Sequence, residues 1–238
     1  MILEVRNVCK SFSGLQALHD VSFEIAAGSI VGVIGPNGAG KTTLFNIIAG
    51  RTAATSGDVI LEGESLAGLA AHRRSMRGVA RTFQLMRPFG SMTALENITI
   101  ASLVERPRRV EAVAAARSVA IRVGLEQWLE RPAKELSTAG LKRLELARAL
   151  AREPSVLLLD EVLAGLSAAE REPLLDLLRE LRDDGMTMLL VEHVMAAVMA
   201  VCSEILVLHH GELIASGTPE NVTRDPRVIE AYLGEALD

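Results

Sequence analysis

The chain has 238 residues, of which 49% are hydrophobic and 23% charged, so it can bury the core of one large domain and is not disordered. Its formal net charge of -5 argues against a nucleic-acid partner. Mean hydropathy is high at +0.28, yet the longest apolar stretches, such as residues 194–202, are far shorter than the ~20 residues of a membrane-spanning helix. Any role at a membrane must therefore come through a partner.

The N-terminal residues and the cysteines indicate the compartment. Residues 1–6 already carry charges and are followed by no continuous apolar segment, so we expect no signal peptide and no export. Cys9 and Cys202 are far apart and form no disulfide or metal-ligand pattern. This usage is typical of a protein in the reducing cytosol.

The first third of the chain is predicted to be rich in β-strands. Residues 2–8 and 21–25 alternate apolar and polar side chains, and residues 57–63 form a strand pattern bounded by glycines. Residues 29–35 are instead a continuous apolar run, which is typical of a central parallel strand covered on both faces.

The last third predicts further strands of this parallel type. Apolar runs occupy residues 155–160, 186–193 and 204–210. Between the first two, residues 170–185 place leucines at i, i+3, i+4 and i+7 and end at Gly185. The spacing predicts an amphipathic crossover helix between two parallel strands.

The middle of the chain has a different character. From 92 to 152 the strand patterns disappear and segments rich in Ala, Arg and Leu replace them. We therefore expect one domain over residues 1–238, in which a helical lobe of residues 92–152 is inserted into an α/β core of residues 1–91 and 153–238.

The segment GPNGAGKTT, residues 35–43, matches the phosphate-loop pattern G-x-x-x-x-G-K-[ST] in full and lies between a predicted strand and a predicted helix. Its glycines allow backbone N–H groups to surround phosphate oxygens at a helix N-terminus. Lys41 is expected to reach the β- and γ-phosphates of a bound nucleotide, and Thr42 to place its hydroxyl on Mg²⁺. The nucleotide-binding residues predicted here are Gly35, Asn37, Gly38, Ala39, Gly40, Lys41, Thr42 and Thr43.

An acidic pair ends the run at 155–160. Asp160 is predicted to lie at the carboxyl edge of the sheet, where ligands of such sheets bind, and to hold Mg²⁺. Glu161 follows it and is placed to orient or deprotonate the attacking water. An acidic pair after a strand is more often a loop start or a helix cap, but the complete phosphate loop upstream favours catalysis.

Together these motifs resemble the ATP-binding subunit of an ABC transporter. The resemblance implies that Phe12 stacks on adenine, that Gln84 reaches Mg²⁺ and the attacking water from the junction with the helical lobe, and that His193 contacts the γ-phosphate. It also implies an α/β fold of the P-loop NTPase (ABC ATPase) class, with an N-terminal antiparallel β region and an inserted helical lobe. The implied catalytic residues are Glu161, His193 and Gln84, and the implied cofactors are ATP and Mg²⁺.

The stretch LSTAG, residues 136–140, lies where the family carries its LSGGQ signature. In the family two subunits pack head to tail around two ATP molecules, so the resemblance implies that Ser137 and Gly140 face the nucleotide of the partner. Ser137 is also predicted to cap the helix that follows, and the two roles are compatible.

Two departures from the family pattern concern the second subunit. Thr138 and Ala139 replace two glycines of the signature, and Ser167 stands where many relatives carry Asp in the loop after Asp160. Our hypothesis is that this subunit pairs with a different ATPase and completes its partner's site less well than a standard signature does.

Residues 79–98 and 217–238 resemble the ATP-binding subunits of branched-chain amino acid importers. The resemblance implies an ATPase that energises uptake of these or similar small solutes through an integral-membrane permease, at the cytoplasmic face of the inner membrane. A second ATP-binding subunit and, indirectly, an external solute-binding protein are the implied partners. Relatives of this group are also associated with urea and amides, so those solutes remain an alternative.

Two other classes of protein fit less well. A soluble ABC ATPase acting on ribosomes or DNA commonly has two cassettes in one chain or a long coiled-coil insertion, and this sequence shows neither. A P-loop GTPase or a small-molecule kinase is disfavoured by the coincidence of Gln84, the signature-like helix start and His193.

Overall fold

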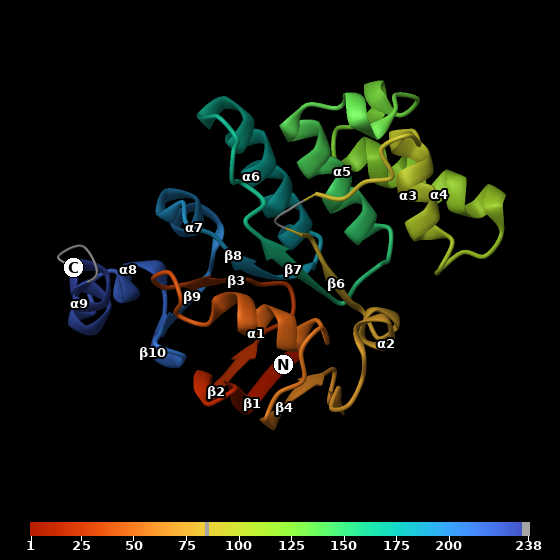
Figure 1. Ribbon diagram of the computed structural model, residues 1–238. Coiled ribbons are helices and arrows are strands. Elements are labelled where there is room, and N and C mark those ends of the chain that lie inside the picture. The colour runs from red at the N-terminus through yellow and green to blue at the C-terminus, as the bar shows by residue number, and fades with distance from the viewer. Residues whose placement is uncertain (84–85, 235–238) are drawn as a thin grey trace.

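The computed structural model describes residues 1–83 and 86–234, which form two β-sheets and surrounding helices (Figure 1). The smaller sheet is antiparallel in the order β2-β1-β4-β5. This confirms the predicted N-terminal antiparallel region. Its strands are β1 (Leu3–Phe12), β2 (Leu15–Ile25), β4 (Ser56–Leu61) and β5 (Glu64–Ser65).

The larger sheet has the order β10-β9-β3-β8-β7-β6. From β9 to β6 all neighbours are parallel, and β10 pairs antiparallel with β9 at one edge. The four strands predicted from continuous apolar runs form its centre, whereas the short β6 and the edge strand β10 have no such run and were missed. Its strands are β3 (Ile30–Ile34), β6 (Val79–Arg81), β7 (Val156–Asp160), β8 (Thr187–Val191), β9 (Glu204–His209) and β10 (Glu212–Gly217).

Helix α1 (Lys41–Ile48) lies between the two sheets (Figure 1). Its buried residues, including Phe45, share one hydrophobic cluster with the small sheet and with one face of the large sheet. The opposite face of the large sheet packs on a second cluster that contains α6 (Ala168–Asp183). Because successive strand residues point to opposite faces, central strands buried on both sides consist of nearly continuous apolar runs.

The described residues from 94 to 150 are helical wherever they have regular structure, and their helices gather at one end of the molecule (Figure 1). Ala112, Ala116 and Ala120 recur every four residues on one face of α4, where their small side chains allow close packing. The division into a lobe and a core stays a prediction. The three longer helices are α3 (Ala94–Ser102), α4 (Arg109–Arg122) and α5 (Thr138–Leu150).

The remaining helical segments are short. They are α2 (Ala71–Met76), α7 (Met195–Val201), α8 (Pro219–Val222), α9 (Pro226–Gly234) and two 3-10 turns (Glu126–Trp128 and Ala133–Glu135). None of the helices in residues 1–83 and 86–234 combines the length and the apolar character needed to cross a membrane.

The crossover helix α6 supports a first testable prediction. Leu178 is fully buried at 0% exposure, so we expect Leu178→Ala to lower the free energy of unfolding by about 2–5 kcal/mol through lost apolar burial and a cavity. Urea unfolding would measure the change. Ile121→Ala in α4, where the side chain is 55% exposed, is the control and should change stability by less than about 0.5 kcal/mol. Equal effects of the two variants would contradict the packing described.

Candidate nucleotide-binding and catalytic site

The phosphate loop connects β3 to α1, and its backbone requires glycine at two positions. Gly35 has φ 149°, and a Cβ there would lie 2.0 Å from the carbonyl oxygen of Leu208. Gly40 has φ 104°, and its Cβ would lie 2.8 Å from the carbonyl oxygen of Ala17. A larger residue at either position would collide with β9 or β2, so glycine allows the loop to lie directly against these strands.

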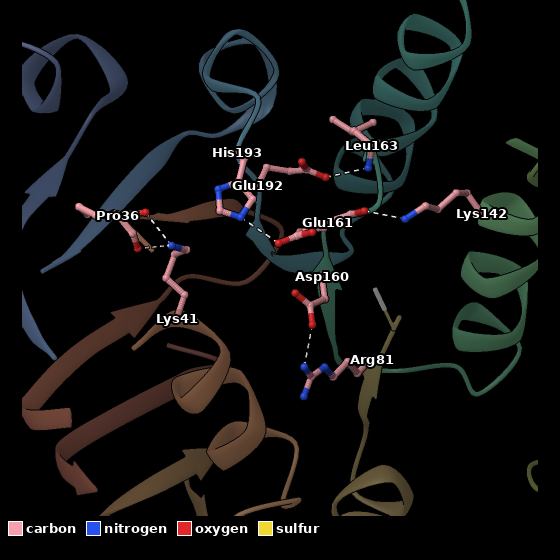
Figure 2. A network of polar contacts seen from close by, with 10 residues as sticks. Pro36, Lys41, Arg81, Lys142, Asp160, Glu161, Leu163, Glu192 and His193 are labelled. Atoms are coloured by element: carbon pink, nitrogen blue, oxygen red, sulfur yellow. Dashed lines mark hydrogen bonds and ion pairs between the residues drawn. The ribbon is translucent and has the colours of Figure 1, made fainter. Parts of the chain in front are cut away.

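Lys41 is the first residue of α1 and is buried at 7% exposure. Its Nζ donates hydrogen bonds to the carbonyl oxygens of Gly35 (2.6 Å) and Pro36 (2.7 Å), which holds the ammonium group over the loop (Figure 2). The backbone N–H groups of the first turn of α1 point toward this loop, because helical N–H groups point to the N-terminal end of their helix. A cation and several N–H donors therefore converge where the sequence predicts phosphate.

Strand register brings the acidic pair and the histidine to this loop. Val33, Val191 and Asp160 are paired across three adjacent parallel strands, β3, β8 and β7. The phosphate loop, His193 and Glu161 begin one or two residues beyond these positions, so all three meet at the carboxyl edge of the sheet.

Asp160 is buried at the end of β7, and its Oδ2 accepts a hydrogen bond from the Nη2 of Arg81 at 2.7 Å (Figure 2). Arg81 also donates from Nη1 to Oδ1 of Asn46 in α1, at 2.7 Å. The backbone N–H of Asp160 donates to the hydroxyl of Thr82 at 3.1 Å. The end of β6 therefore positions the carboxylate, a role that the sequence analysis did not assign to either residue.

The oxygen donors present fit a magnesium ion bound together with a nucleotide. Asp160 and the exposed Thr42 line one pocket of about 650 Å³, together with Asn46 and Arg81. Mg²⁺ takes one or two protein oxygens, retains several waters and is completed by substrate phosphates. Gln84, the third predicted ligand, lies outside the described residues.

Arg81 and Asp160 form a buried ion pair, with side-chain exposures of 7% and 9%. We expect Arg81→Met to lower the free energy of unfolding by about 3–5 kcal/mol, because it leaves a carboxylate buried without its partner. Arg117→Met is the control, since the pair of Arg117 with Glu130 is exposed and worth about 0–1 kcal/mol. Urea unfolding of both variants would measure the difference. A loss below about 1 kcal/mol for Arg81→Met would refute the structural importance of the pair.

Glu161 and His193 lie in contact. The distance between Glu161 Oε1 and His193 Nε2 is 2.9 Å, and the histidine side chain is half exposed (Figure 2). Glu161 has φ 50°, a left-handed conformation that costs a residue other than glycine about 1–3 kcal/mol. The contact sets a carboxylate and an imidazole side by side, as acid-base chemistry on a bound water requires.

Two buried charged residues support the backbone around Glu161, and the sequence analysis missed both. The Nζ of Lys142 in α5 donates to the carbonyl oxygen of Glu161 at 2.7 Å, and Oε1 of Glu192 accepts from the N–H of Leu163 at 2.7 Å (Figure 2). Burial lowers the pKa of Lys142, against the attraction of Glu192 and Glu161, and raises the pKa of Glu192. The sequence gives no sign of this burial. Lys142 lies within a predicted helix and Glu192 next to His193, where a charged side chain can equally well be exposed.

Ser137 caps α5, as the sequence predicts. The Ser137 hydroxyl oxygen accepts a hydrogen bond from the N–H of Gly140 at 3.2 Å, and Ser137 is exposed. Ser167 is the N-cap residue of α6, and its bonds differ from those of Ser137: its N–H and its hydroxyl both donate to Oε2 of Glu170, at 2.9 Å and 2.7 Å. The serine that replaces the family's aspartate therefore starts a helix.

Phe12 is the last residue of β1, a strand of the small antiparallel sheet. Its ring is 45% exposed, and the Nζ of Lys10 lies 4.7 Å from the ring centroid. An exposed aromatic face is available for stacking, and the adenine contact stays a prediction.

Comparison with known proteins agrees with this site. The profile of the ABC transporter family matches residues 18–164, and that of the branched-chain amino acid ATP-binding cassette transporters matches residues 212–238. LivG is a high-affinity branched-chain amino acid transport ATP-binding protein of Escherichia coli (strain K12). It is 39% identical to this chain over an alignment of 251 positions, gaps included, which covers 99% of this chain and 98% of LivG.

Solved structures agree as well. A nucleotide-free ATP-binding cassette from an ABC transporter superposes with a TM-score of 0.90 at 32% identity, covering 97% of this chain and 98% of that one. The ADP conformation of MJ1267, an ATP-binding cassette of an ABC transporter, gives a TM-score of 0.89 at 31% identity, with 98% of each chain covered.

The fold and the phosphate loop thus define an ATP-binding cassette, a nucleotide-binding ATPase. The chain belongs to the ABC transporter family, among its branched-chain amino acid ATP-binding cassette members. The predicted fold class and family are confirmed.

Proposed function

We propose that this ATPase drives uptake of branched-chain amino acids or similar small solutes through a membrane permease. The observation that carries the proposal is the meeting of the phosphate loop, Asp160, Glu161 and His193 at one sheet edge, in a chain related to LivG along nearly its full length. LivG itself is a branched-chain amino acid transport ATP-binding protein.

Each residue of the site has a task in this proposal. Lys41 and the loop N–H groups bind the β- and γ-phosphates of ATP, and Phe12 stacks on adenine. Glu161 accepts a proton from the attacking water, while His193, 2.9 Å away, orients that carboxylate and contacts the γ-phosphate. Thr42, Asp160 and Gln84 would hold Mg²⁺, which neutralises charge on the phosphates when bound.

The active form is a dimer that closes on two ATP molecules and opens after hydrolysis. Ser137 and Gly140 at the start of α5 would contact the γ-phosphate bound by the partner, since a capped helix N-terminus favours anions. ATP shifts the dimer toward the closed form because it binds that form more tightly. The altered signature residues Thr138 and Ala139 support pairing with a second, distinct ATPase.

The permease contact is expected along Gln84 and the segment that follows it, residues 85–90. Phe83, directly before this segment, and Phe89, within it, expose 39% and 48% of their surface, and Arg51 Cζ lies 5.3 Å from the centroid of the Phe83 ring. Exposed aromatic and arginine side chains are enriched in protein interfaces. In this arrangement the subunit sits at the cytoplasmic face of the inner membrane, and an external solute-binding protein acts only through the permease.

Affinity purification from gently solubilised native membranes, followed by mass spectrometry, tests the proposal. We expect two hydrophobic permease chains and a second ATPase to co-purify with this subunit. The solute specificity then follows from uptake assays of the assembled complex with leucine, urea and amides. Recovery from the soluble fraction with ribosomes or DNA-associated proteins would overturn the transport function while leaving the ATPase class intact.

A further inference from the structure

We propose that Lys142 is a positioning residue that ties the catalytic Glu161 to the start of α5, and so links the two ATP sites of the dimer. The inference rests on the proposed function, because it assigns Glu161 as the base and Ser137 as the contact to the partner's nucleotide. It adds a residue that neither the phosphate loop nor the signature contains.

The first observation is the bond itself. Lys142 is buried at 5% exposure, and its Nζ donates to the carbonyl oxygen of Glu161 at 2.7 Å, so a charged donor fixes the backbone of the base (Figure 2). Hydrogen bonds of charged donors are roughly twice as strong as those between neutral groups. The contact is to the backbone, so it orients Glu161 without competing for its carboxylate.

The second observation is that the backbone of Glu161 needs support. Its φ of 50° is a conformation that residues other than glycine keep only where the surroundings impose it. The N–H of Glu161 donates to the carbonyl of Val191 at 2.9 Å, and Glu192 accepts from the N–H of Leu163 at 2.7 Å. Lys142 supplies a side-chain hydrogen bond to the carbonyl oxygen of Glu161, and it does so from helix α5.

The third observation is the position of Lys142 in α5. It lies four residues, about one helical turn, after Thr138, and helical side chains lean toward the N-terminus of their helix. The distance along the helix from Ser137 to Lys142 is about 7.5 Å at the α-helical rise. A shift of the helix start therefore moves the lysine that holds the base.

The loop after Asp160 lacks the aspartate that many relatives carry there, which makes a link through Lys142 relevant. Ser167 stands where many relatives carry aspartate, and its polar groups are bonded to Glu170 of its own helix. A connection through Lys142 provides another route between the signature of a subunit and the base of that same subunit.

Lys142→Met tests the inference, with Lys142→Arg as the conservative variant and Arg143→Met as the matched control. Arg143 is the next residue of α5, and its Nη1 donates to the carbonyl of Val123 at 2.6 Å, so it makes the same kind of bond to a different target. In the isolated chain we expect Lys142→Met to speed amide hydrogen exchange across residues 160–166 by about tenfold or more. Lys142→Arg should restore most of the protection, and Arg143→Met should leave this segment unchanged.

Turnover in the assembled transporter is the second measurement. We expect Lys142→Met to lower kcat by about tenfold to a hundredfold, because a misplaced base loses its geometry, while the KM for ATP stays within about twofold. Unchanged exchange at residues 160–166, or an equal kcat loss in Arg143→Met, would overturn the inference. A wild-type subunit that recruits no permease would instead refute the proposed function, and the exchange measurement would still decide whether Lys142 positions Glu161.

Discussion

Replacing Lys41 with alanine is expected to weaken ATP binding by at least about 100-fold. The ammonium group is held over the phosphate loop by the carbonyl oxygens of Gly35 and Pro36, where it can donate to phosphate oxygens. Each hydrogen bond from a charged donor is worth about 1.5–3 kcal/mol, and a factor of ten corresponds to about 1.4 kcal/mol. Loss of two such bonds to the phosphates would therefore weaken ATP binding by at least about 100-fold.

Isothermal titration of ATP into the isolated chain would measure this loss. Lys134→Ala, at an exposed position of the chain, is the control and should bind ATP like the wild type. A melting temperature measured without nucleotide separates lost binding from unfolding. If a folded Lys41→Ala protein titrated ATP normally, the assigned role of the lysine would be wrong.

Glu161→Gln is expected to retain ATP binding and to lose most turnover, by about 10²- to 10⁴-fold. The amide has the shape of the carboxylate and can still contact His193, but it cannot accept a proton from the attacking water. Only the chemical step should therefore change.

Phosphate release by the assembled transporter, combined with ATP titration of the same variant, would test this separation. Glu220→Gln makes the same chemical change at an exposed position of α8 and should leave both quantities unaltered. Near-normal phosphate release by Glu161→Gln would show that another group is the main base.

Much of the fold could be predicted because the large sheet has a local sequence signal. Strands covered on both faces have nearly continuous apolar runs, which mark β3, β7, β8 and β9. Strand β6 has only three residues, which is too short for a long apolar run. Strand β10 lies at the edge of the sheet and is not covered on both faces, so it also lacks such a run. Helix α6 begins at Ala168, two residues before the predicted start, because Ser167 is its N-cap.

The sequence by itself determined the phosphate loop, the helix cap at Ser137 and the family. The loop and the cap depend on residues within a few positions of one another, whose φ angles, N–H groups and side chains act together, and the family is indicated by several such short motifs in a characteristic order along the chain. The positions of Gly35, Gly40 and Lys41 illustrate this, since their spacing alone specifies a loop that leads into a helix.

Only the tertiary structure decided which groups support the acidic pair. Arg81 and Asp160 are 79 residues apart, Lys142 and Glu161 are 19 apart, and Leu163 and Glu192 are 29 apart. Strand order and helix packing set these contacts, and burial makes each of them strong by removing water. A charged side chain gives the same sequence signal whether it is solvated or buried, so its partner can be identified only in the folded structure.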